Sequence, residues 1–363
     1  MDKCIPSKPE VNISGVILVF LMLLAISVIG SSQAVASNET RGVANKDPGS
    51  DLWRNVRQRN SDIEGISQVK SIDSGILINP QAEKWTEFRT GPLNDYGLIV
   101  LALFVLVILV FYVFRGGVRI QGGLSGRMLF RFGDFERVLH WVLALVFLFL
   151  AVTGFTLLFG RTLLIPVIGH DLFSLLASSS KEAHNLFGPI FFVSLILMIV
   201  SFARRNLYAK GDLTWLLKGG GMIGSSHVSA GFFNMGEKIW YWLVILAGLV
   251  ISLSGLILVS PSLGQGRVVM ELAHVVHSIA AIGLCAISFG HIYLATVGTE
   301  GTGEGMKTGY VDINWAKAHH SRWARECHDQ DKIISAENYA KLQGKNLAET
   351  STSSVTDEVE LKS

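Results

Sequence analysis

The chain has 363 residues, of which 50% are hydrophobic and only 17% are charged. Its mean hydropathy is +0.43, and its apolar residues are concentrated in runs of about 18 or more, which is long enough to cross a bilayer. This composition excludes an ordinary soluble domain. The net charge of +2 is less informative than the positions of Lys and Arg. We expect the lipid bilayer as a partner and no nucleic acid.

The N-terminus has the pattern of a secretory signal peptide. A basic start precedes an apolar stretch over 13–29 and the small-residue pattern A-V-A that ends at Ala36. This predicts a signal peptide over residues 1–36, although the apolar stretch is also long enough to remain as an anchor. In both cases residue 37 onward starts outside. Residues 37–95 are polar and contain no His or Cys, which predicts an extracytoplasmic segment.

Five apolar segments have the length of membrane spans. They cover roughly residues 97–114, 139–159, 185–203, 239–259 and 274–297. The loops 115–138 and 204–238 are rich in Arg and Lys, whereas 160–184 and 260–273 carry few. The positive-inside rule therefore puts the first two loops in the cytoplasm and the other two outside.

The stretch 160–184 is apolar enough to suggest a sixth span. Pro166 and Gly169 interrupt it, and a span there would invert the charge bias. We interpret it as an interfacial outer loop. The expected fold is an all-α integral membrane bundle with five transmembrane helices after the signal peptide. Its parts are an additional helix over 96–114, a four-helix domain over 115–300 and a cytoplasmic tail over 301–363.

Four histidines lie in or beside these apolar segments. His277 and His291 are fourteen residues apart in one segment, which on a helix separates them by about 21 Å and turns them by only about 40°. His140 and His184 lie on two other segments. The topology puts His140 and His291 near the cytoplasmic face, and His184 and His277 near the outer face. Ionisable side chains at membrane depth indicate a functional site.

These depth-matched pairs predict two stacked haems. Neutral imidazole binds iron, and helix bundles build cofactor sites between facing helices. Only three cysteines occur, far apart and without a C-x-x-C-H motif, so the haems would be non-covalent and of b type. The residues alone leave open a proton relay or a metal site of a transporter.

Other residues of the apolar segments have less specific explanations. His274 is turned about 100° from the face of His291, so we expect it to bond a haem propionate instead. Several glycines would let a helix or a porphyrin approach, and small residues are common at membrane helix interfaces. They are Gly154, Gly188, Gly255, Gly283 and Gly290. We expect the remaining histidines to be solvated: His170, His227, His319, His320 and His328.

Five sequence strings, in this order, resemble the cytochrome b (gamma) subunit of respiratory formate dehydrogenases, in its longer bacterial form. They are RFGDFERVLHW, KEAHNLFG, FNMGEKIWYW, HSIAAIGLCAISFGHIY and NWAKAHHSRWARE. The resemblance covers roughly residues 125–326. It implies two b haems on four histidines: His140 with His291 on the cytoplasmic side, and His184 with His277 on the outer side.

The resemblance also implies a site for menaquinone or ubiquinone beside the cytoplasmic-side haem. The family's Asn-x-Gly motif is matched by Asn234 and Gly236, with Glu237 where the best-known members carry Gln. The amide of Asn234 is a donor for a quinone carbonyl, and a ring nitrogen of His291 could bond a quinone oxygen. Without the resemblance, Asn-x-Gly more often marks a turn and a helix start, and a first-turn glutamate suits the helix dipole.

The resemblance further implies two partners: an iron-sulfur (beta) subunit that feeds the outer haem, and a molybdenum- or tungsten-containing (alpha) subunit that oxidises formate. The chain would lie in a bacterial inner membrane with its C-terminus in the cytoplasm. The basic, aromatic string NWAKAHHSRWARE would dock a partner or headgroups, or form a solvated amphipathic tail, and we expect disorder beyond Cys327. The alternatives are the cytochrome b subunit of a hydrogenase or thiosulfate reductase, and a proton or metal transporter.

Overall fold

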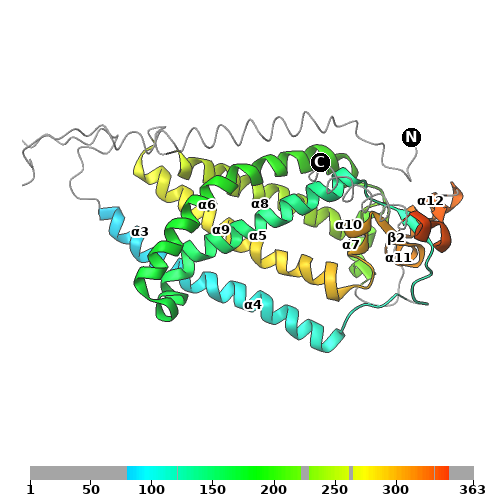
Figure 1. Ribbon diagram of the computed structural model, residues 1–363, viewed down its shortest axis with the longest axis horizontal. Helices are drawn as coiled ribbons and strands as arrows, with labels where there is room; N and C mark the ends of the chain where they lie inside the picture. Colours follow the sequence, from blue (N-terminus) through cyan, green and yellow to red (C-terminus); the bar gives the residue numbers. More distant parts are fainter. Residues whose placement is uncertain (1–79, 121, 222–228, 261–264, 331, 343–363) are drawn as a thin grey trace, which may run out of the picture.

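The computed structural model describes residues 80–342 except 121, 222–228, 261–264 and 331. Within this part of the chain, five long helices form an elongated bundle (Figure 1). They are α4 (Pro92–Arg115), α5 (Asp134–Leu163), α6 (Ile165–Phe202), α8 (Met235–Val259) and α9 (Arg267–Tyr293). All five are long and apolar enough to cross a membrane. The helical membrane bundle with five spans is therefore confirmed, and the predicted signal peptide lies outside the described residues.

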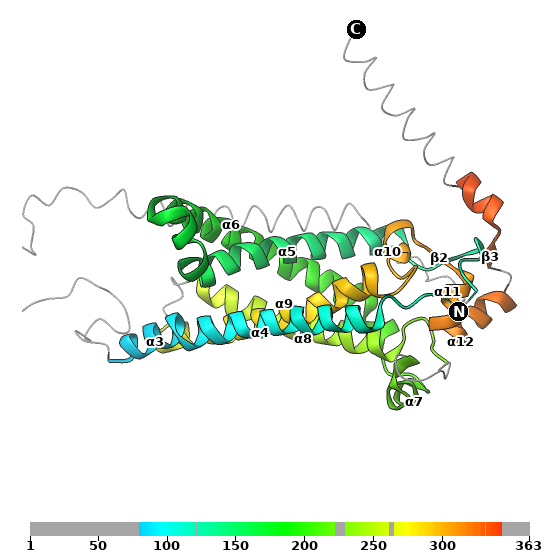
Figure 2. The ribbon, with the colours of Figure 1, turned by 90° about the horizontal axis from the view of Figure 1, so that it is seen from below.

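Short elements occupy the two ends of the bundle. The helix α3 (Pro80–Thr90) lies at one end, and a small sheet lies at the other with α10 (Glu304–Thr308), α11 (Ile313–His319) and α12 (Ser321–Asp329) (Figures 1 and 2). We call these the α3 end and the sheet end. The remaining short helix, α7 (Asp212–Leu217), lies between α6 and α8 in the chain. Single turns cover Ala203–Asn206, Gly219–Gly221 and Leu294–Gly298.

The long helices extend beyond the apolar runs that predicted them, because their first turns are polar or begin with proline. The α4 helix starts at Pro92, where a missing N–H costs nothing. At the start of α5, the Glu136 carboxylate accepts a hydrogen bond from the Gly133 N–H at 3.0 Å. Hydropathy reports only the part of a helix inside the membrane, so it places the starts of these helices too late in the sequence.

The loop conformation predicted for 160–184 is wrong, because this stretch is helical. The α5 helix continues to Leu163, and α6 begins at Ile165. Gly169 breaks the helical backbone with φ 76° and ψ 173°, a conformation that glycine adopts without steric cost. Gly169 therefore separates two helical stretches of α6, which meet at a kink. They add no sixth candidate span to the described residues.

The helices of the bundle pack closely. A Cβ at Gly248 of α8 would lie 2.9 Å from Leu195 of α6, and a Cβ at Gly97 of α4 would lie 2.9 Å from Ile282 of α9. The α4 helix is also held by the Asn94 amide, which donates to the Leu158 carbonyl at 3.1 Å. Glycine at both positions allows these close approaches, so the additional N-terminal helix is part of the bundle.

The sheet joins two segments that are far apart in the sequence. Strand β1 (Met128–Phe130) precedes α5, whereas β2 (Tyr310–Asp312) and β3 (Ile333–Ile334) follow α9. The order is β2-β1-β3 and both pairings are antiparallel, with Met128 opposite Asp312 and Ile334. The Asp312 carboxylate also accepts from the Ser125 N–H at 2.9 Å. The first basic loop and the C-terminal tail therefore form one folded unit.

This unit has its own hydrophobic core, which corrects the expectation of a solvated tail. Its buried members are Ile120, Leu129, Val311, Ile313, Trp315, Ala316, Trp323, Ala324 and Cys327. Strand β3 lies beyond Cys327, where the sequence predicted disorder, so that boundary was placed too early. Burial of two tryptophans compensates for the polar composition of the segment. Residues 343–363 lie outside the described part of the chain.

Candidate functional site

Two pairs of imidazoles face each other inside the bundle. His140 of α5 and His291 of α9 have ring centroids 6.4 Å apart with planes inclined by 62°. His184 of α6 and His277 of α9 are 6.1 Å apart at 74°. Since a metal–imidazole bond is about 2 Å and the centroid lies about 1 Å further, two imidazoles on opposite sides of one ion have centroids about 6 Å apart. The structure brings together both pairs that the sequence predicted.

Hydrogen bonds at Nδ1 orient both imidazoles of the His184–His277 pair. His184 Nδ1 lies 2.8 Å from Thr153 Oγ1, and the Thr153 hydroxyl itself donates to the Phe149 carbonyl at 3.0 Å. His277 Nδ1 lies 2.9 Å from the Ile251 carbonyl, which can only accept. Each Nδ1 therefore carries the proton, and each Nε2 keeps the lone pair that a metal needs.

Glycines leave room for these rings. A Cβ at Gly154 would lie 3.3 Å from His184 Cε1, and a Cβ at Gly255 would lie 3.2 Å from His277 Cε1. Glycine is the residue that fits at both positions. Three other glycines have open space where a Cβ would lie: Gly188, Gly283 and Gly290. In the described part of the chain, no atom of a neighbouring helix lies within 4 Å of that position, so close helix packing does not explain these glycines.

The His140–His291 pair has a different environment. The His140 Nδ1 is buried and makes no hydrogen bond to a described residue, although an unsatisfied buried polar atom costs about 1–3 kcal/mol. The His291 ring stacks on Trp240 at a centroid distance of 4.7 Å and an angle of 12°. The facing imidazoles fit a bis-imidazole haem at each pair, and the metal-binding tautomer and the open space beside Gly188, one turn after His184, add to this fit at the His184–His277 pair.

At the start of α8, Asn234 and Glu237 form a capping box. The Asn234 Oδ1 accepts from the Glu237 N–H at 2.9 Å, and Glu237 Oε2 accepts from the Asn234 N–H at 2.9 Å. The helix-start explanation of the motif is therefore correct, yet the cap does not use the NH₂ group of Asn234. Gly236 faces α7, since a Cβ there would lie 3.0 Å from the Trp215 ring.

A buried arginine holds the second oxygen of Glu237, and sequence reasoning missed this contact. Arg131 Nη2 donates to Glu237 Oε1 at 2.9 Å, with the arginine side chain 3% exposed and the glutamate 32%. The Arg131 guanidinium lies 4.7 Å from the Trp315 ring centroid and 5.1 Å from that of Phe132. Burial lowers the pKa of Arg131 below its ordinary value, and Glu237 opposes this shift. Aromatic rings and a carboxylate together stabilise this buried cation.

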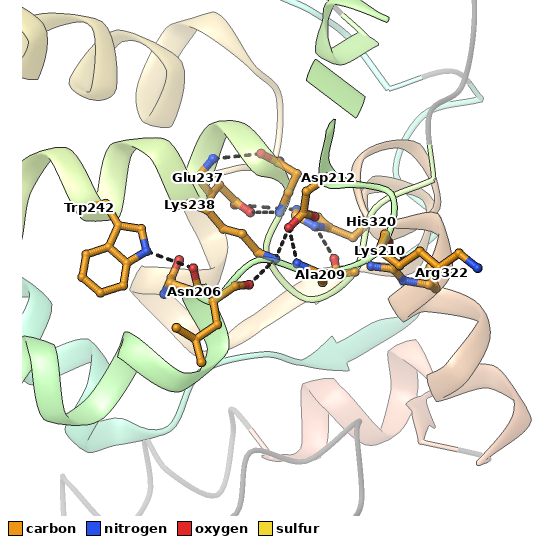
Figure 3. Close-up of polar contacts among 12 residues, drawn as sticks. Asn206, Ala209, Lys210, Asp212, Glu237, Lys238, Trp242, His320 and Arg322 are labelled. Atoms are coloured by element: carbon orange, nitrogen blue, oxygen red, sulfur yellow. Dashed lines mark hydrogen bonds and ion pairs between the residues drawn. The ribbon is translucent and has the colours of Figure 1, made fainter. Parts of the chain in front are cut away.

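The expectation that His320 is solvated was wrong. It is fully buried, its Nδ1 lies 2.9 Å from the Gly231 carbonyl, and its Nε2 lies 3.7 Å from Glu237 Oε1. Burial, and then the nearby Arg131 charge, lower the pKa of His320 well below 6.5. The imidazole is therefore neutral. It was missed because its burial depends on the packing of the tail against the start of α8 (Figure 3).

The other histidines follow the prediction more closely. His170 and His328 are exposed, and His319 is half-buried. His227 lies outside the described residues. His274 is exposed at the α3 end, with its ring centroid 5.6 Å from that of Trp85. Its bond to a haem propionate stays a prediction.

A second buried ion pair fixes the chain that enters α8 (Figure 3). Lys238 Nζ lies 2.7 Å from Asp212 Oδ2, and both side chains are 5% exposed. The same ammonium donates to the Leu207 carbonyl at 2.9 Å, and Asp212 accepts from the Ala209 N–H at 2.7 Å. These contacts tie α7 to α8, and so hold Trp215 against Gly236.

Similarity to known proteins agrees with this architecture. The chain is 30% identical over 195 residues to the formate dehydrogenase cytochrome b556(fdo) subunit of Escherichia coli, covering 53% of this chain and 89% of that relative. The chain belongs to the formate dehydrogenase cytochrome b556 subunit family. The nitrate-inducible cytochrome b556(Fdn) subunit of the same organism is 30% identical over 213 residues, covering 56% of this chain and 93% of the relative. A Haemophilus influenzae cytochrome b556 subunit is 28% identical over 199 residues, covering 52% and 79%.

Residues 131–309 also match the family model of prokaryotic cytochrome b561. The resemblance seen in the sequence strings is thereby confirmed, and membership in this cytochrome b556 family makes the chain a multi-pass membrane protein that binds haem b. The matched range contains all four paired histidines and the Asn234–Glu237 segment. The helices α3 and α4 lie outside it.

Proposed function

We propose that this chain is the membrane subunit of a formate dehydrogenase complex and passes electrons through two b haems to quinone. The facing imidazole pairs at two levels of one bundle support this most directly, since bound haem b supplies one-electron transfer. Formate oxidation would belong to a molybdenum- or tungsten-containing (alpha) subunit, with an iron-sulfur (beta) subunit between them.

In this proposal the four histidines hold the haems and set their positions. His184 and His277 hold the haem nearer the α3 end, and His140 and His291 hold the haem nearer the sheet end. The two ligands on α9, His277 and His291, are about 21 Å apart along the helix. The bundle thereby spaces two redox centres along the membrane normal.

Quinone would bind beside His291, at the start of α8. The helix cap uses only Oδ1 of Asn234, so its NH₂ group, which donates to no described residue, could donate to a quinone carbonyl. Glu237 lies close enough to His291 for an electrostatic interaction, and it is partly exposed. Reduction of menaquinone or ubiquinone to quinol takes two electrons and two protons, and Glu237 would deliver protons from the aqueous side. Gly236 would allow the ring to approach the backbone.

The sheet end would face the cytoplasm of a bacterial inner membrane. The basic loops 115–138 and 204–238 both join helices at this end, as the positive-inside rule requires of cytoplasmic loops. We expect a reporter enzyme fused after Ser363 to be active inside the cell, and one fused after Asn60 to be active outside. Labelling of the C-terminus from outside in intact cells would contradict this orientation.

Purification of the native complex tests the proposed function. We expect two non-covalent haems per copy of this chain, both reduced by formate and reoxidised by quinone, together with a co-purifying subunit that oxidises formate. Haem extraction and absorption spectra give these quantities. One haem per chain would contradict the pairing, and reduction by hydrogen or thiosulfate in place of formate would assign the chain to a different oxidoreductase.

Replacing Asn234 tests the quinone site. Because Asn234 also caps α8, Asn234→Ser is the informative variant: serine keeps the cap but lacks the amide donor. We expect both haems to remain and haem reoxidation by limiting quinone to slow by roughly fivefold to tenfold, the effect of losing about one hydrogen bond. Asn234→Ala would add a loss of helix stability. Reoxidation of Asn234→Ser at the wild-type rate would refute the site while leaving the cytochrome assignment intact.

A further inference from the structure

We propose that the hydroxyls of Thr153 and Ser254 position the ligands His184 and His277 and hold the reduction potential of their haem below that of the haem on His140 and His291. This inference rests on the proposed haem sites. It adds a cause for electrons to move from the α3 end toward the sheet end.

The same arrangement occurs on two helix pairs. A hydroxyl residue followed by glycine on one helix meets a histidine on the next: Thr153 and Gly154 of α5 meet His184 of α6, and Ser254 and Gly255 of α8 meet His277 of α9. The Thr153 Oγ1 to His184 Nδ1 distance is 2.8 Å, and the Ser254 Oγ to His277 Nδ1 distance is 3.2 Å. Both hydroxyl residues are buried.

The direction of these hydrogen bonds follows from the hydroxyl protons. The Ser254 hydroxyl donates to the Val250 carbonyl of its own helix at 2.7 Å, and the Thr153 hydroxyl likewise donates within α5. Each oxygen can therefore only accept from the imidazole. The neighbouring glycines let the rings approach, since a Cβ at either would lie within 3.3 Å of a ring carbon. Hydroxyl and glycine together fix the rotation of each ring.

An imidazole that donates from Nδ1 becomes a more basic ligand at Nε2. A more basic axial ligand stabilises ferric over ferrous iron, which lowers the reduction potential. In the other pair, His140 lacks this support, since its Nδ1 makes no hydrogen bond to a described residue. The two haems therefore differ in ligand basicity, and the difference favours electron flow away from the His184–His277 haem.

Potentiometric titration of both haems in the purified complex, with each haem identified by its low-spin ferric spectrum, tests this. Thr153→Val keeps the side-chain shape and removes the hydroxyl acceptor, while the Leu150 carbonyl remains as a second hydrogen-bond partner of His184. We expect it to raise the reduction potential of the haem on His184 and His277, and to leave the potential of the other haem unchanged. The haem that is lost in His184→Ala identifies which of the two signals belongs to this pair. A tenfold change in the preference of the ligand for ferric iron corresponds to about 59 mV for a one-electron couple.

Two further variants sharpen the test. Thr153→Ser should restore the potential, because it restores the acceptor. Ser254→Ala should shift the same haem less, because the contact of Ser254 Oγ with His277 Nδ1 is 3.2 Å long, against 2.8 Å for Thr153 Oγ1 with His184 Nδ1. The matched control is Ser252→Ala, which removes a buried α8 hydroxyl without a hydrogen-bond partner among the described residues. It should change neither haem.

The outcomes separate this inference from the proposed function. Unchanged potentials in Thr153→Val, or equal shifts of both haems, would overturn the role of the hydroxyls while the ligands stand. If Thr153→Val does not retain its haem, Ser254→Ala decides, and a zero shift there refutes the proposal. Retention of both haems in His184→Ala would instead overturn the ligand assignment itself.

Discussion

Replacing His291 with alanine is expected to remove the haem nearer the sheet end and to lower formate-dependent quinone reduction by more than about 100-fold. Loss of a partner that only supports a metal ligand already costs about 10–100-fold, and His291 is proposed as a ligand itself. Its ring faces His140 at a centroid distance of 6.4 Å, and no described residue makes a hydrogen bond to His140 Nδ1 that would compensate. Haem content and quinone reduction, measured on the same preparation, check this prediction.

The control for His291→Ala is His320→Gln. His320 is also a buried histidine at the sheet end, but it lies against Glu237 rather than in a facing pair. We expect His320→Gln to keep both haems. Two haems per chain in His291→Ala would show that another residue replaces it, and the pairing with His140 would then be wrong.

The facing histidines could be predicted because a membrane fixes depth. His140 and His291 are far apart in the sequence, yet each apolar segment runs from one face to the other, so position along a segment gives height in the bilayer. Helix periodicity then gives the face on which His277 and His291 lie. These two rules were sufficient to choose the pairs without any knowledge of the helix packing, and the structure brings both pairs together.

The environment of Glu237 could not be predicted in this way. In the sequence, Arg131 is one of several basic residues of the loop 115–138. The neighbouring strand β1 has only three residues, which is too few for a periodic hydrophobic pattern. Its burial depends on Trp315 and Trp323, which come from the far end of the chain and pack in the same unit. Packing between short segments that are far apart in the chain produces no hydrophobic pattern in the sequence around Arg131.

The same packing bears on the proposed quinone site. Glu237 uses Oε2 for the cap of α8 and Oε1 for Arg131, while the pair of Lys238 and Asp212 fixes the next residue of the helix. Breaking a buried ion pair by removing one partner costs about 3–5 kcal/mol. These ion pairs tie the start of α8, and with it Asn234, to Arg131 and to α7.

Replacing His277 with alanine is expected to interrupt electron transfer one step earlier than the change at His291. The haem on His184 and His277 should be lost, while the other haem stays bound, because its ligands lie about 21 Å away along α9 or on α5. Formate should then fail to reduce the remaining haem in the intact complex, with a loss of more than about 100-fold, although dithionite should still reduce it. The control is His274→Ala, one turn earlier on α9, where the ring packs near Trp85 instead of facing another histidine. It should retain both haems and most of the activity. If formate still reduced the remaining haem of His277→Ala at the wild-type rate, electrons would enter the bundle by a route that bypasses this pair, and the order of the two haems would have to be reversed.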